Sequence, residues 1–261
     1  MVLNDYTKLF PEIGQEVWHF PILSRSMPLA KKLIDKYSRT ANGRIIWTDV
    51  LTDAKGRFER KWIAKKGGLW ITCSIFDEFL PQTSSFFPLI FGLVMLKCAY
   101  DFKIFSAKIK WINDLHFNGK KLGGVLIEKY KEWYIVGIGM NINNDPPKKL
   151  PAISFKQILG MELPLKKIIE RLIYWLRYYL GYLRFYEKAV LEEEKINNLI
   201  IQEFKKFSDT IGRCVYYSYN LDFSENGIIG KAINIDEKGS LIIKTENQIL
   251  SVNTGEIIYL L

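Results

Sequence analysis

The chain has 261 residues, 48% of them hydrophobic and 14% aromatic, which suits one sizeable domain or one domain with a small appendage. Its three scattered cysteines and two histidines argue against a disulfide scaffold or a cysteine-framed zinc site, and favour a reducing cytoplasm. The net charge of +9 is dispersed in lysine pairs, which is more typical of a solvated surface than of a nucleic-acid-binding arm. We expect no signal peptide and no membrane span, since no apolar run approaches roughly 20 residues.

In chain order, the first 208 residues mix helical and strand patterns. Apolar residues at helical spacing predict a short amphipathic helix over 29–38 and a buried helix over 86–102. β-Branched and aromatic runs between turn signals predict strands over 43–52, 68–76, 106–114, 121–130 and 132–143. A long basic loop separates the first two strands, and a proline-punctuated connection follows the last.

The pattern then becomes helical over residues 165–206, with an acidic run at 192–194 that we interpret as a solvated turn or face. After residue 208, five short strand-like segments separated by glycines and polar turns predict a small SH3-like β-barrel. We therefore divide the chain into domains 1–208 and 209–261.

Residues 110–124, KWINDLHFNGKKLGG, predict a β-hairpin with unusual charge beside a hydrophobic strand. The pair Asn-Gly at 118–119 is the strongest short hairpin signal, because a type I′ turn needs positive φ at both central residues. This turn predicts that Phe117 faces Lys120, His116 faces Lys121 and Asp114 faces Gly123 across the strands.

Because side chains alternate along a strand, Asp114 and Lys121 would share one face of the hairpin. Gly123 and Gly124 leave that face free for the close approach of a ligand or another backbone. A lysine, a carboxylate and a glycine floor predict an anion site, and the alternative is a hairpin whose charges are merely solvated.

The basic loop TDAKGRFERKW, residues 52–62, surrounds one glycine with lysines and arginines and ends in a tryptophan. Guanidinium groups bind phosphate through paired donors, so the loop suits a phosphate ligand. Taken alone it is a weak signal, because most such loops are only solvated.

These segments, in this order, resemble the biotin protein ligase family, also called biotin–[acetyl-CoA-carboxylase] ligase. The loop resembles TAGRGRRGRKW, and the hairpin resembles the KWPND…KxxG block. Three further segments, GGLW (67–70), GIGMNIN (137–143) and TGEI (254–257), resemble the family's GGLY, GIGINVN and SGEV. The resemblance runs from about residue 22 to the C-terminus.

The resemblance implies an α+β fold: a mixed β-sheet flanked by helices, like that of class II synthetases, followed by the SH3-like domain. It also implies a two-step reaction in which biotin and ATP give biotinyl-5′-AMP, and a lysine of a biotin carboxyl carrier protein then takes the biotin. We further expect Mg²⁺ as cofactor, a homodimer and a cytoplasmic location, with no nucleic-acid or membrane partner.

The resemblance also assigns roles to residues. The catalytic set is Lys121, Asp114, Arg57 and Lys110, in which Lys121 bridges carboxylate and α-phosphate, while Asp114 orients the incoming amine or helps to hold Mg²⁺. The biotin-binding set is Arg25, Ser26, Met27, Leu51, Lys55, Gly56, Arg57, Trp62, Lys121 and Gly124. The ATP-binding set is Arg57, Arg60, Trp62, Asn113, Lys121 and Asn141. We expect the arginine loop to close over the adenylate and exclude water.

The departures from the family pattern fall mostly where biotin would be recognised. Leu51 stands where a Gln typically binds the ureido group, and Arg25 replaces a Ser while Ser26 takes the neighbouring Thr position. The remaining departures are Ala54, Lys55, Glu59 and Ile112, in place of Gly, Arg, Gly and Pro. Adenylation is therefore the firmer expectation and ureido recognition the weaker one.

Two alternatives stay open. A lipoate or octanoate ligase shares the fold and the hairpin lysine, although the chain has no RRxSGGG segment and its C-terminal strands favour the biotin branch. The other alternative is a non-catalytic protein, either a biotin-responsive DNA-binding repressor or a basic RNA-binding module. We expect no repressor, because only about twenty residues precede the matching region.

Overall fold

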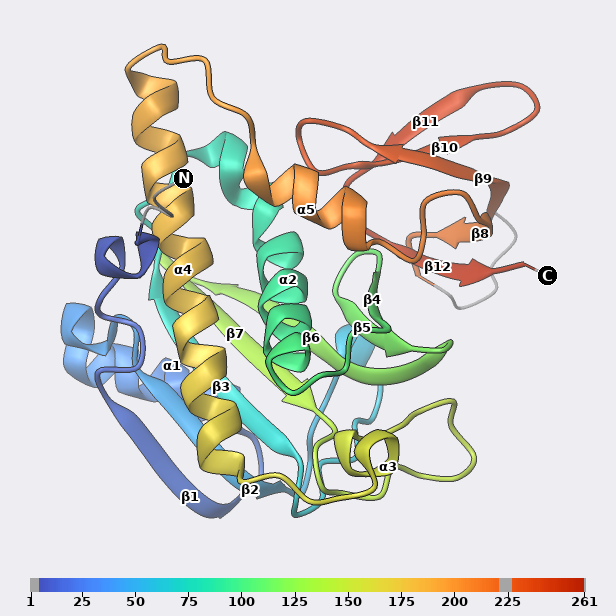
Figure 1. Ribbon diagram of the computed structural model, residues 1–261. Coiled ribbons are helices and arrows are strands. Elements are labelled where there is room, and N and C mark those ends of the chain that lie inside the picture. The colour runs from blue at the N-terminus through green and yellow to red at the C-terminus, as the bar shows by residue number, and fades with distance from the viewer. Residues whose placement is uncertain (1–4, 221–226, 261) are drawn as a thin grey trace.

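The computed structural model describes residues 5–220 and 227–260, in which seven strands form a mixed sheet and five form a second, antiparallel sheet (Figure 1). The large sheet has the order β1-β2-β3-β7-β6-β5-β4. Strands β1 and β2 are parallel, and all other neighbouring strands of this sheet are antiparallel. Its strands are β1 (Val17–Leu23), β2 (Ile45–Leu51), β3 (Leu69–Phe76), β4 (Ala107–Lys110), β5 (Asp114–Phe117), β6 (Lys120–Tyr130) and β7 (Trp133–Met140).

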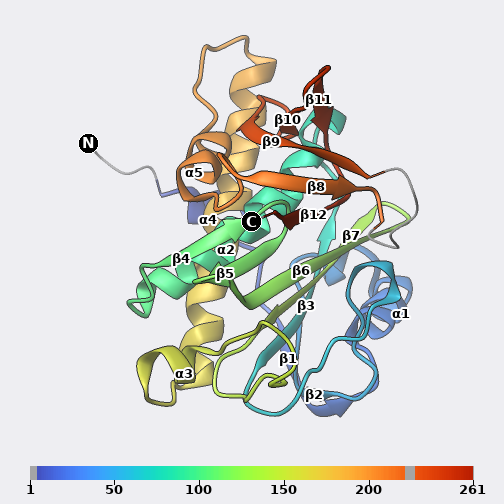
Figure 2. The same cartoon turned by 90° about the vertical axis from the view of Figure 1, so that its right-hand side faces the viewer.

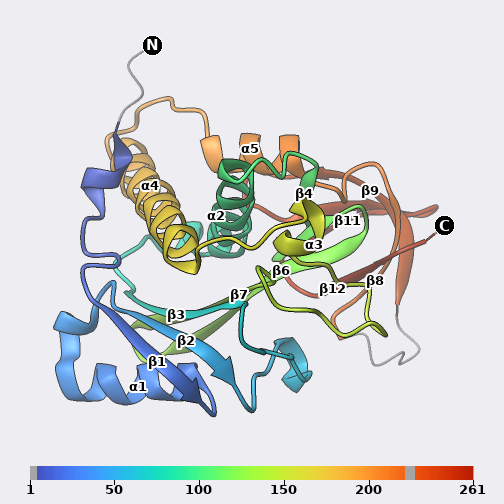
Figure 3. The ribbon, with the colours of Figure 1, turned by 60° about the horizontal axis from the view of Figure 1, so that its bottom comes forward.

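Helices cover both faces of this sheet, which confirms the predicted α+β fold (Figure 3). Helix α1 (Ser26–Tyr37) packs on one face through Met27, Ala30 and Ile34, and α2 (Phe87–Asp101) and α4 (Leu165–Leu191) lie on the other. The remaining helices are α3 (Phe155–Leu159), α5 (Leu199–Phe207) and the 3₁₀ turns η1 (Tyr6–Leu9), η2 (Ser38–Ala41), η3 (Arg57–Glu59) and η4 (Pro81–Phe86). Since both faces are covered, β3 is apolar along most of its length.

The region Pro81–Asp101 is long and apolar enough to cross a membrane, which the sequence prediction overlooked. However, 72% of its most apolar window is buried inside the protein. Helix α2 packs against α4, α5 and the large sheet, so it is the buried helix predicted for 86–102.

The hairpin of β5 and β6 has the predicted turn, with positive φ at both Asn118 (47°) and Gly119 (75°). His116 faces Lys121 and Phe117 faces Lys120, as predicted. Asp114 faces Gly124 rather than Gly123, because a bulge shifts the register between Leu115 and His116. The bulge thus places Asp114 directly opposite Gly124, the second glycine of the pair.

Other boundaries differ from the prediction for local reasons. Strand β1 was not predicted, and α1 begins at Ser26 rather than at residue 29. The helical pattern of 165–206 is divided into α4 and α5, with the acidic run just after the end of α4 and Asn198 capping α5. The short helix α3 was missed, although Ser154 and Gln157 form a capping box at its start.

The second sheet contains all five predicted strand segments: β8 (Cys214–Ser218), β9 (Ile228–Ile235), β10 (Leu241–Lys244), β11 (Ile249–Val252) and β12 (Glu256–Tyr259). Their order is β11-β10-β9-β8-β12. The sheet lies beside the β4–β5 end of the large sheet (Figure 2). There the Asp209 amide donates to the Ile109 carbonyl at 2.7 Å, so the two sheets are joined next to the hairpin.

Candidate active site

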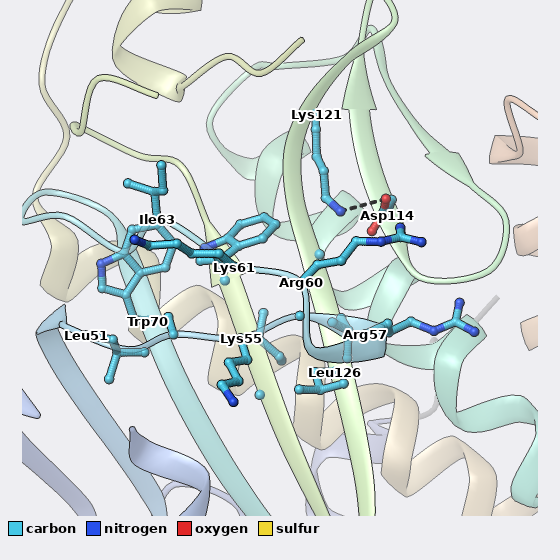
Figure 4. A pocket seen from close by; sticks show the side chains of 18 of the residues that line it. Leu51, Lys55, Arg57, Arg60, Lys61, Ile63, Trp70, Asp114, Lys121 and Leu126 are labelled. Atoms are coloured by element: carbon cyan, nitrogen blue, oxygen red, sulfur yellow. Dashed lines mark ion pairs between the residues drawn. The ribbon is translucent and has the colours of Figure 1, made fainter. Parts of the chain in front are cut away.

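A cavity of roughly 370 Å³ lies over the α1 face of the large sheet (Figure 4). Its floor is made by strands β3, β7 and β6, where Gly124, Gly137 and Gly139 let side chains of the walls approach the backbone closely. Its walls are α1, the loop 52–62, the hairpin and the proline-rich segment 146–152. The predicted residues that line it are Arg25, Ser26, Met27, Leu51, Lys55, Gly56, Arg57, Arg60, Trp62, Asn113, Asp114, Lys121, Gly124 and Asn141.

One end of the cavity carries the ion pair of the hairpin, which we call the hairpin end. Lys121 Nζ lies 2.7 Å from Asp114 Oδ2, and the two side chains face each other in Figure 4. A Cβ at Gly124 would lie 2.9 Å from Asp114 Oδ1 and 3.1 Å from Lys121 Cε, so only glycine fits beneath the pair. Lys121 Nζ also lies 5.0 Å from the ring centre of Trp62.

The charges of this end keep Asp114 ionised. Burial raises the pKa of its carboxyl, but the charge and hydrogen bond of Lys121 outweigh burial, so the pKa lies below its ordinary value. His116 lies behind the carboxylate, with Nε2 4.0 Å from Asp114 Oδ2. Burial lowers the pKa of His116 to about 4, so this imidazole is neutral at neutral pH.

Lys110 is the one predicted catalytic residue outside the cavity lining. Its Nζ lies 4.9 Å from the ring centre of Tyr259, and burial lowers its pKa against the opposing charge of Asp114. At this position its charge helps to lower the pKa of Asp114.

The loop 52–62 contacts the second sheet. Arg57 Nη1 donates to the Gly255 carbonyl at 2.9 Å, and Arg60 forms a two-pronged ion pair with Glu256, whose Nη1–Oε1 distance is 2.8 Å. Among the described residues after Ala152, only Glu256 lines the cavity. The sequence prediction quoted TGEI but did not place its glutamate in the site.

Two consecutive loop residues adopt the left-handed conformation: Phe58 with φ of 54° and Glu59 with φ of 56°. Such φ values are uncommon for residues other than glycine, and the family pattern quoted above has a glycine where this chain has Glu59. Glu59 forms an ion pair with Lys55, and Phe58 packs edge-on against Tyr219 with ring centres 6.1 Å apart.

The other end of the cavity, which we call the α1 end, lies where the first residues of α1 pack on β3 and β7. Ser26 Oγ and Thr72 Oγ1 lie 2.7 Å apart and are buried. A Cβ at Gly137 would lie 3.2 Å from Met27 Sδ, so Met27 covers that glycine. Thr72 and Trp70 were not predicted as site residues, although both lie in the strand 68–76.

The two predicted asparagines are held by the protein itself. Asn113 Nδ2 donates to the Val125 carbonyl at 2.5 Å, and Asn141 Oδ1 accepts from Asn144 Nδ2 at 2.9 Å. Both side chains are therefore fixed where they border the cavity.

Within residues 5–220 and 227–260, no group of three or more His, Cys, Asp or Glu side chains is placed to hold a metal ion. Asp114 is paired with Lys121, and Arg57 and Lys110 add positive charge near it. The residues present therefore do not form a metal site of the protein's own.

The fold and the cavity define the class of this protein. Residues 25–145, which include the loop, the hairpin and most of the cavity lining, match the biotin/lipoate A/B protein ligase family. Residues 221–259 match the biotin protein ligase C-terminal domain, and the two matches together cover more than half of the chain. The second match selects the biotin branch, and the chain belongs to the biotin protein ligase family.

Known proteins agree with this assignment along nearly the whole chain. The bifunctional ligase/repressor BirA of Bacillus subtilis is 24% identical over 94% of this chain and 74% of its own length. The biotin–[acetyl-CoA-carboxylase] ligase of Mycobacterium tuberculosis is 26% identical over 58% of this chain and 53% of its own. The structure of the Aquifex aeolicus biotin protein ligase with biotin and ATP superposes with a TM-score of 0.76 at 24% identity, covering 94% of this chain and 98% of that one.

Proposed function

We propose that this chain is an ATP-dependent ligase that activates biotin as biotinyl-5′-AMP and transfers the biotin to a lysine of a biotin carboxyl carrier protein. The observation that supports it best is that every predicted binding residue lines one cavity, from the hydroxyls of the α1 end to the ion pair of the hairpin end. A relative, the biotin–[acetyl-CoA-carboxylase] ligase of Mycobacterium tuberculosis, carries the name of this activity.

In the first step a carboxylate oxygen of biotin forms a bond to the α-phosphorus of ATP, and the bond from that phosphorus to the bridging oxygen of the β-phosphate breaks. Pyrophosphate leaves with the electron pair. Two anions must approach each other, so a fixed cation at the point of contact lowers the barrier. Lys121 is that cation, and Asp114 holds its ammonium in place at 2.7 Å.

In the second step the ε-amine of the acceptor lysine attacks the acyl carbon, and AMP leaves with the electron pair of the broken acyl–oxygen bond. Asp114 is ionised, so it accepts a hydrogen bond from the incoming amine and stabilises the positive charge that develops on nitrogen. A carboxylate with a lowered pKa is a weak base, so its main contribution is orientation, and water takes the proton.

Arg57 and Arg60 stand at the rim of the cavity, and we assign them to the phosphates and the adenylate. Trp62 and Asn141 border the same space and are assigned to the nucleotide. Mg²⁺ would be bound by the phosphates of ATP, because the described side chains form no metal site.

Four further expectations belong to this proposal. The chain divides into a catalytic domain, 1–208, and an SH3-like domain, 209–261. It works in the cytoplasm, without a nucleic-acid or membrane partner. It forms a homodimer through the edge of the large sheet at β1, because the β4 edge is already joined to Ser208 and Asp209.

The deciding experiment incubates the protein with ATP, Mg²⁺ and either biotin or lipoate, followed by mass spectrometry for the acyl-adenylate. Addition of a carrier domain then tests transfer to its lysine. We expect biotinyl-adenylate and a biotinylated carrier. Formation of lipoyl-adenylate alone would instead favour the lipoate ligase alternative, for which Leu51 at the cavity wall is the supporting residue.

A further inference from the structure

Strand β12, the last strand of the second sheet, contacts two of the predicted cationic residues. Its Glu256 forms the ion pair with Arg60 of the loop. Further along the same strand, the aromatic ring of Tyr259 lies beside Lys110, with 4.9 Å between Lys110 Nζ and the ring centre. The second sheet therefore reaches the predicted catalytic set at a place that does not line the cavity.

The Lys110 ammonium has few other contacts. Among the residues that the structure describes, Lys110 forms no ion pair and no side-chain hydrogen bond. Burial lowers its pKa, and the charges of Asp114 and Glu256 offset only part of that effect. An ammonium gains most from an aromatic face where water is excluded. The ring of Tyr259 is thus the direct contact that favours the charged form of Lys110.

The Tyr259 side chain is itself fixed to the segment that it contacts. Its hydroxyl oxygen lies 3.0 Å from Thr210 Oγ1, which also accepts from the Trp111 amide at 2.9 Å. Trp111 directly follows Lys110, and Thr210 is buried. A second cation, Arg213, lies with Cζ 4.5 Å from the ring centre, but its charge is already paired with a carboxylate. The ring is therefore held in place beside Lys110.

Lys110 lies directly opposite Asp114 in the pairing of β4 with β5. Residues opposite each other across two strands have Cβ atoms about 4.5–5.5 Å apart on the same face. Asp114 is therefore flanked by Lys110 on the β4 side and by Lys121 on the β6 side, where the ion pair measures 2.7 Å. With Lys110 these three groups have a net positive charge, whereas Asp114 and Lys121 alone cancel.

We infer that Tyr259 is a positioning residue of the reaction, because its ring holds the Lys110 ammonium beside Asp114. The inference rests on the proposed function, in which a carboxylate and a triphosphate meet at the hairpin end. Both are anions, so the positive charge that Lys110 adds stabilises their approach and the charge of the transition state. Tyr259 itself does not line the cavity, and it acts on the reaction through Lys110.

The test compares Tyr259→Leu, which removes the ring, with Tyr259→Phe, which keeps the ring and removes only the hydroxyl. Pyrophosphate release is measured in both, in Lys110→Met and in the double variant Lys110→Met/Tyr259→Leu. We expect kcat to fall about tenfold in Lys110→Met and about fivefold in Tyr259→Leu, with the KM for biotin nearly unchanged. Tyr259→Phe should stay near the parent, and the double variant should lose no more than Lys110→Met.

Two kinetic results would overturn the inference. One is an equal loss of kcat in Tyr259→Phe and Tyr259→Leu, and the other is a double variant whose loss is the product of the two single losses. Ile257→Ala, which truncates a buried side chain of β12, is the control for loosened packing. An equal loss of kcat in Ile257→Ala, at a temperature where thermal unfolding shows it folded, would also assign the effect to packing. Tyr259→Met replaces Tyr259→Leu if the latter does not fold.

A spectroscopic measurement separates this inference from the proposed function. In protein labelled with ¹³C at the lysine ε-carbons, the Lys110 signal is the one that disappears in Lys110→Met. The ring of Tyr259 should shift this signal upfield, and the shift should persist in Tyr259→Phe and vanish in Tyr259→Leu. If the signal behaves so but no biotinyl-adenylate forms, the proposed function fails and the placement of Lys110 by Tyr259 stands. If the adenylate forms but the signal shows no shift that depends on the ring, the inference alone fails.

Discussion

At the hairpin end of the cavity an ammonium and a carboxylate lie 2.7 Å apart over a glycine, whereas at the α1 end two neutral hydroxyls lie 2.7 Å apart beneath a helix. Under the proposed function the charged pair holds negative charge during phosphoryl chemistry, so we expect it to act mainly on the rate. The neutral pair lies at the other end of the cavity, so we expect it to act mainly on binding. Substitutions at the two ends should therefore separate kcat from KM.

The largest effect is expected for Lys121→Ala. Loss of the cation at the reacting phosphate should slow pyrophosphate release about 10²–10³-fold while the fold stays intact. Lys120→Ala is the matched control, because Lys120 is the adjacent exposed lysine and does not line the cavity. Pyrophosphate release near the parent rate in Lys121→Ala would remove the distinction between the two ends.

A second effect concerns stability in acid and arises from His116 at the hairpin end. Its pKa is about 4 in the folded protein against an ordinary 6.5, because burial opposes the charged form and Lys110 and Lys121 reinforce burial against the attraction of Asp114. The unfolded chain therefore binds the proton first, and the free energy of unfolding falls as the pH drops from 6.5 to 4. The loss amounts to about 3 kcal/mol at pH 4 and levels off below that pH, where the folded protein binds the proton as well.

Urea unfolding at pH 7, 5 and 4 measures this loss. His116→Phe should reduce the difference between pH 7 and pH 4, because no buried imidazole remains to be protonated. His19→Gln is the control, since the His19 side chain is 44% exposed. An unchanged pH dependence in His116→Phe would assign the acid sensitivity to other groups.

Two glycines of the cavity floor give a smaller and more direct comparison. Gly124→Ala would place a methyl 2.9 Å from Asp114 Oδ1, whereas Gly137→Ala would place one 3.2 Å from the flexible thioether of Met27. We expect Gly124→Ala to lower kcat about tenfold by displacing the ion pair, and Gly137→Ala to raise the KM for biotin several-fold with little change in kcat. Steady-state kinetics at saturating ATP checks both, and the reverse assignment would contradict the comparison.

The sequence could predict the hairpin end because its parts are local. Asp114 and Lys121 belong to one hairpin, and the Asn118–Gly119 turn sets their register, apart from the bulge that brings Asp114 opposite Gly124. The α1 end could not be predicted in the same way. Ser26 and Thr72 meet only through the packing of α1 on β3, and no local pattern marks Thr72 among the apolar residues of its strand.

The contacts between the two sheets could not be predicted from local sequence patterns either. The motif TGEI marked the end of the C-terminal domain, yet its glutamate meets Arg60 across 196 residues of sequence. Periodicity predicted most strands of both sheets but missed β1, since strand patterns are local, and how the second sheet docks depends on contacts such as that between Asp209 and Ile109. Sequence reasoning thus predicted elements and motifs better than the surfaces through which they meet.

The smallest expected effect is that of Glu256→Gln, which removes the ion pair between the C-terminal sheet and the loop. The Arg60 side chain is 48% exposed and that of Glu256 is 13% exposed, so water screens the pair from one side and the free energy of unfolding should fall by about 1 kcal/mol. The contact from Arg57 to the Gly255 carbonyl remains in this variant.

Because salt screens exposed charges, the difference between Glu256→Gln and the parent should shrink further in 1 M NaCl. Glu246→Gln is the control, because Glu246 is an exposed carboxylate in the turn between β10 and β11 and has no ion pair among the described residues. A loss of several kcal/mol in Glu256→Gln alone would mean that the docking of the second sheet depends on this pair. The loop beside the hairpin end would then contribute to the stability of the fold as well as to the reaction rate. The α1 end alone would be specialised for the substrate.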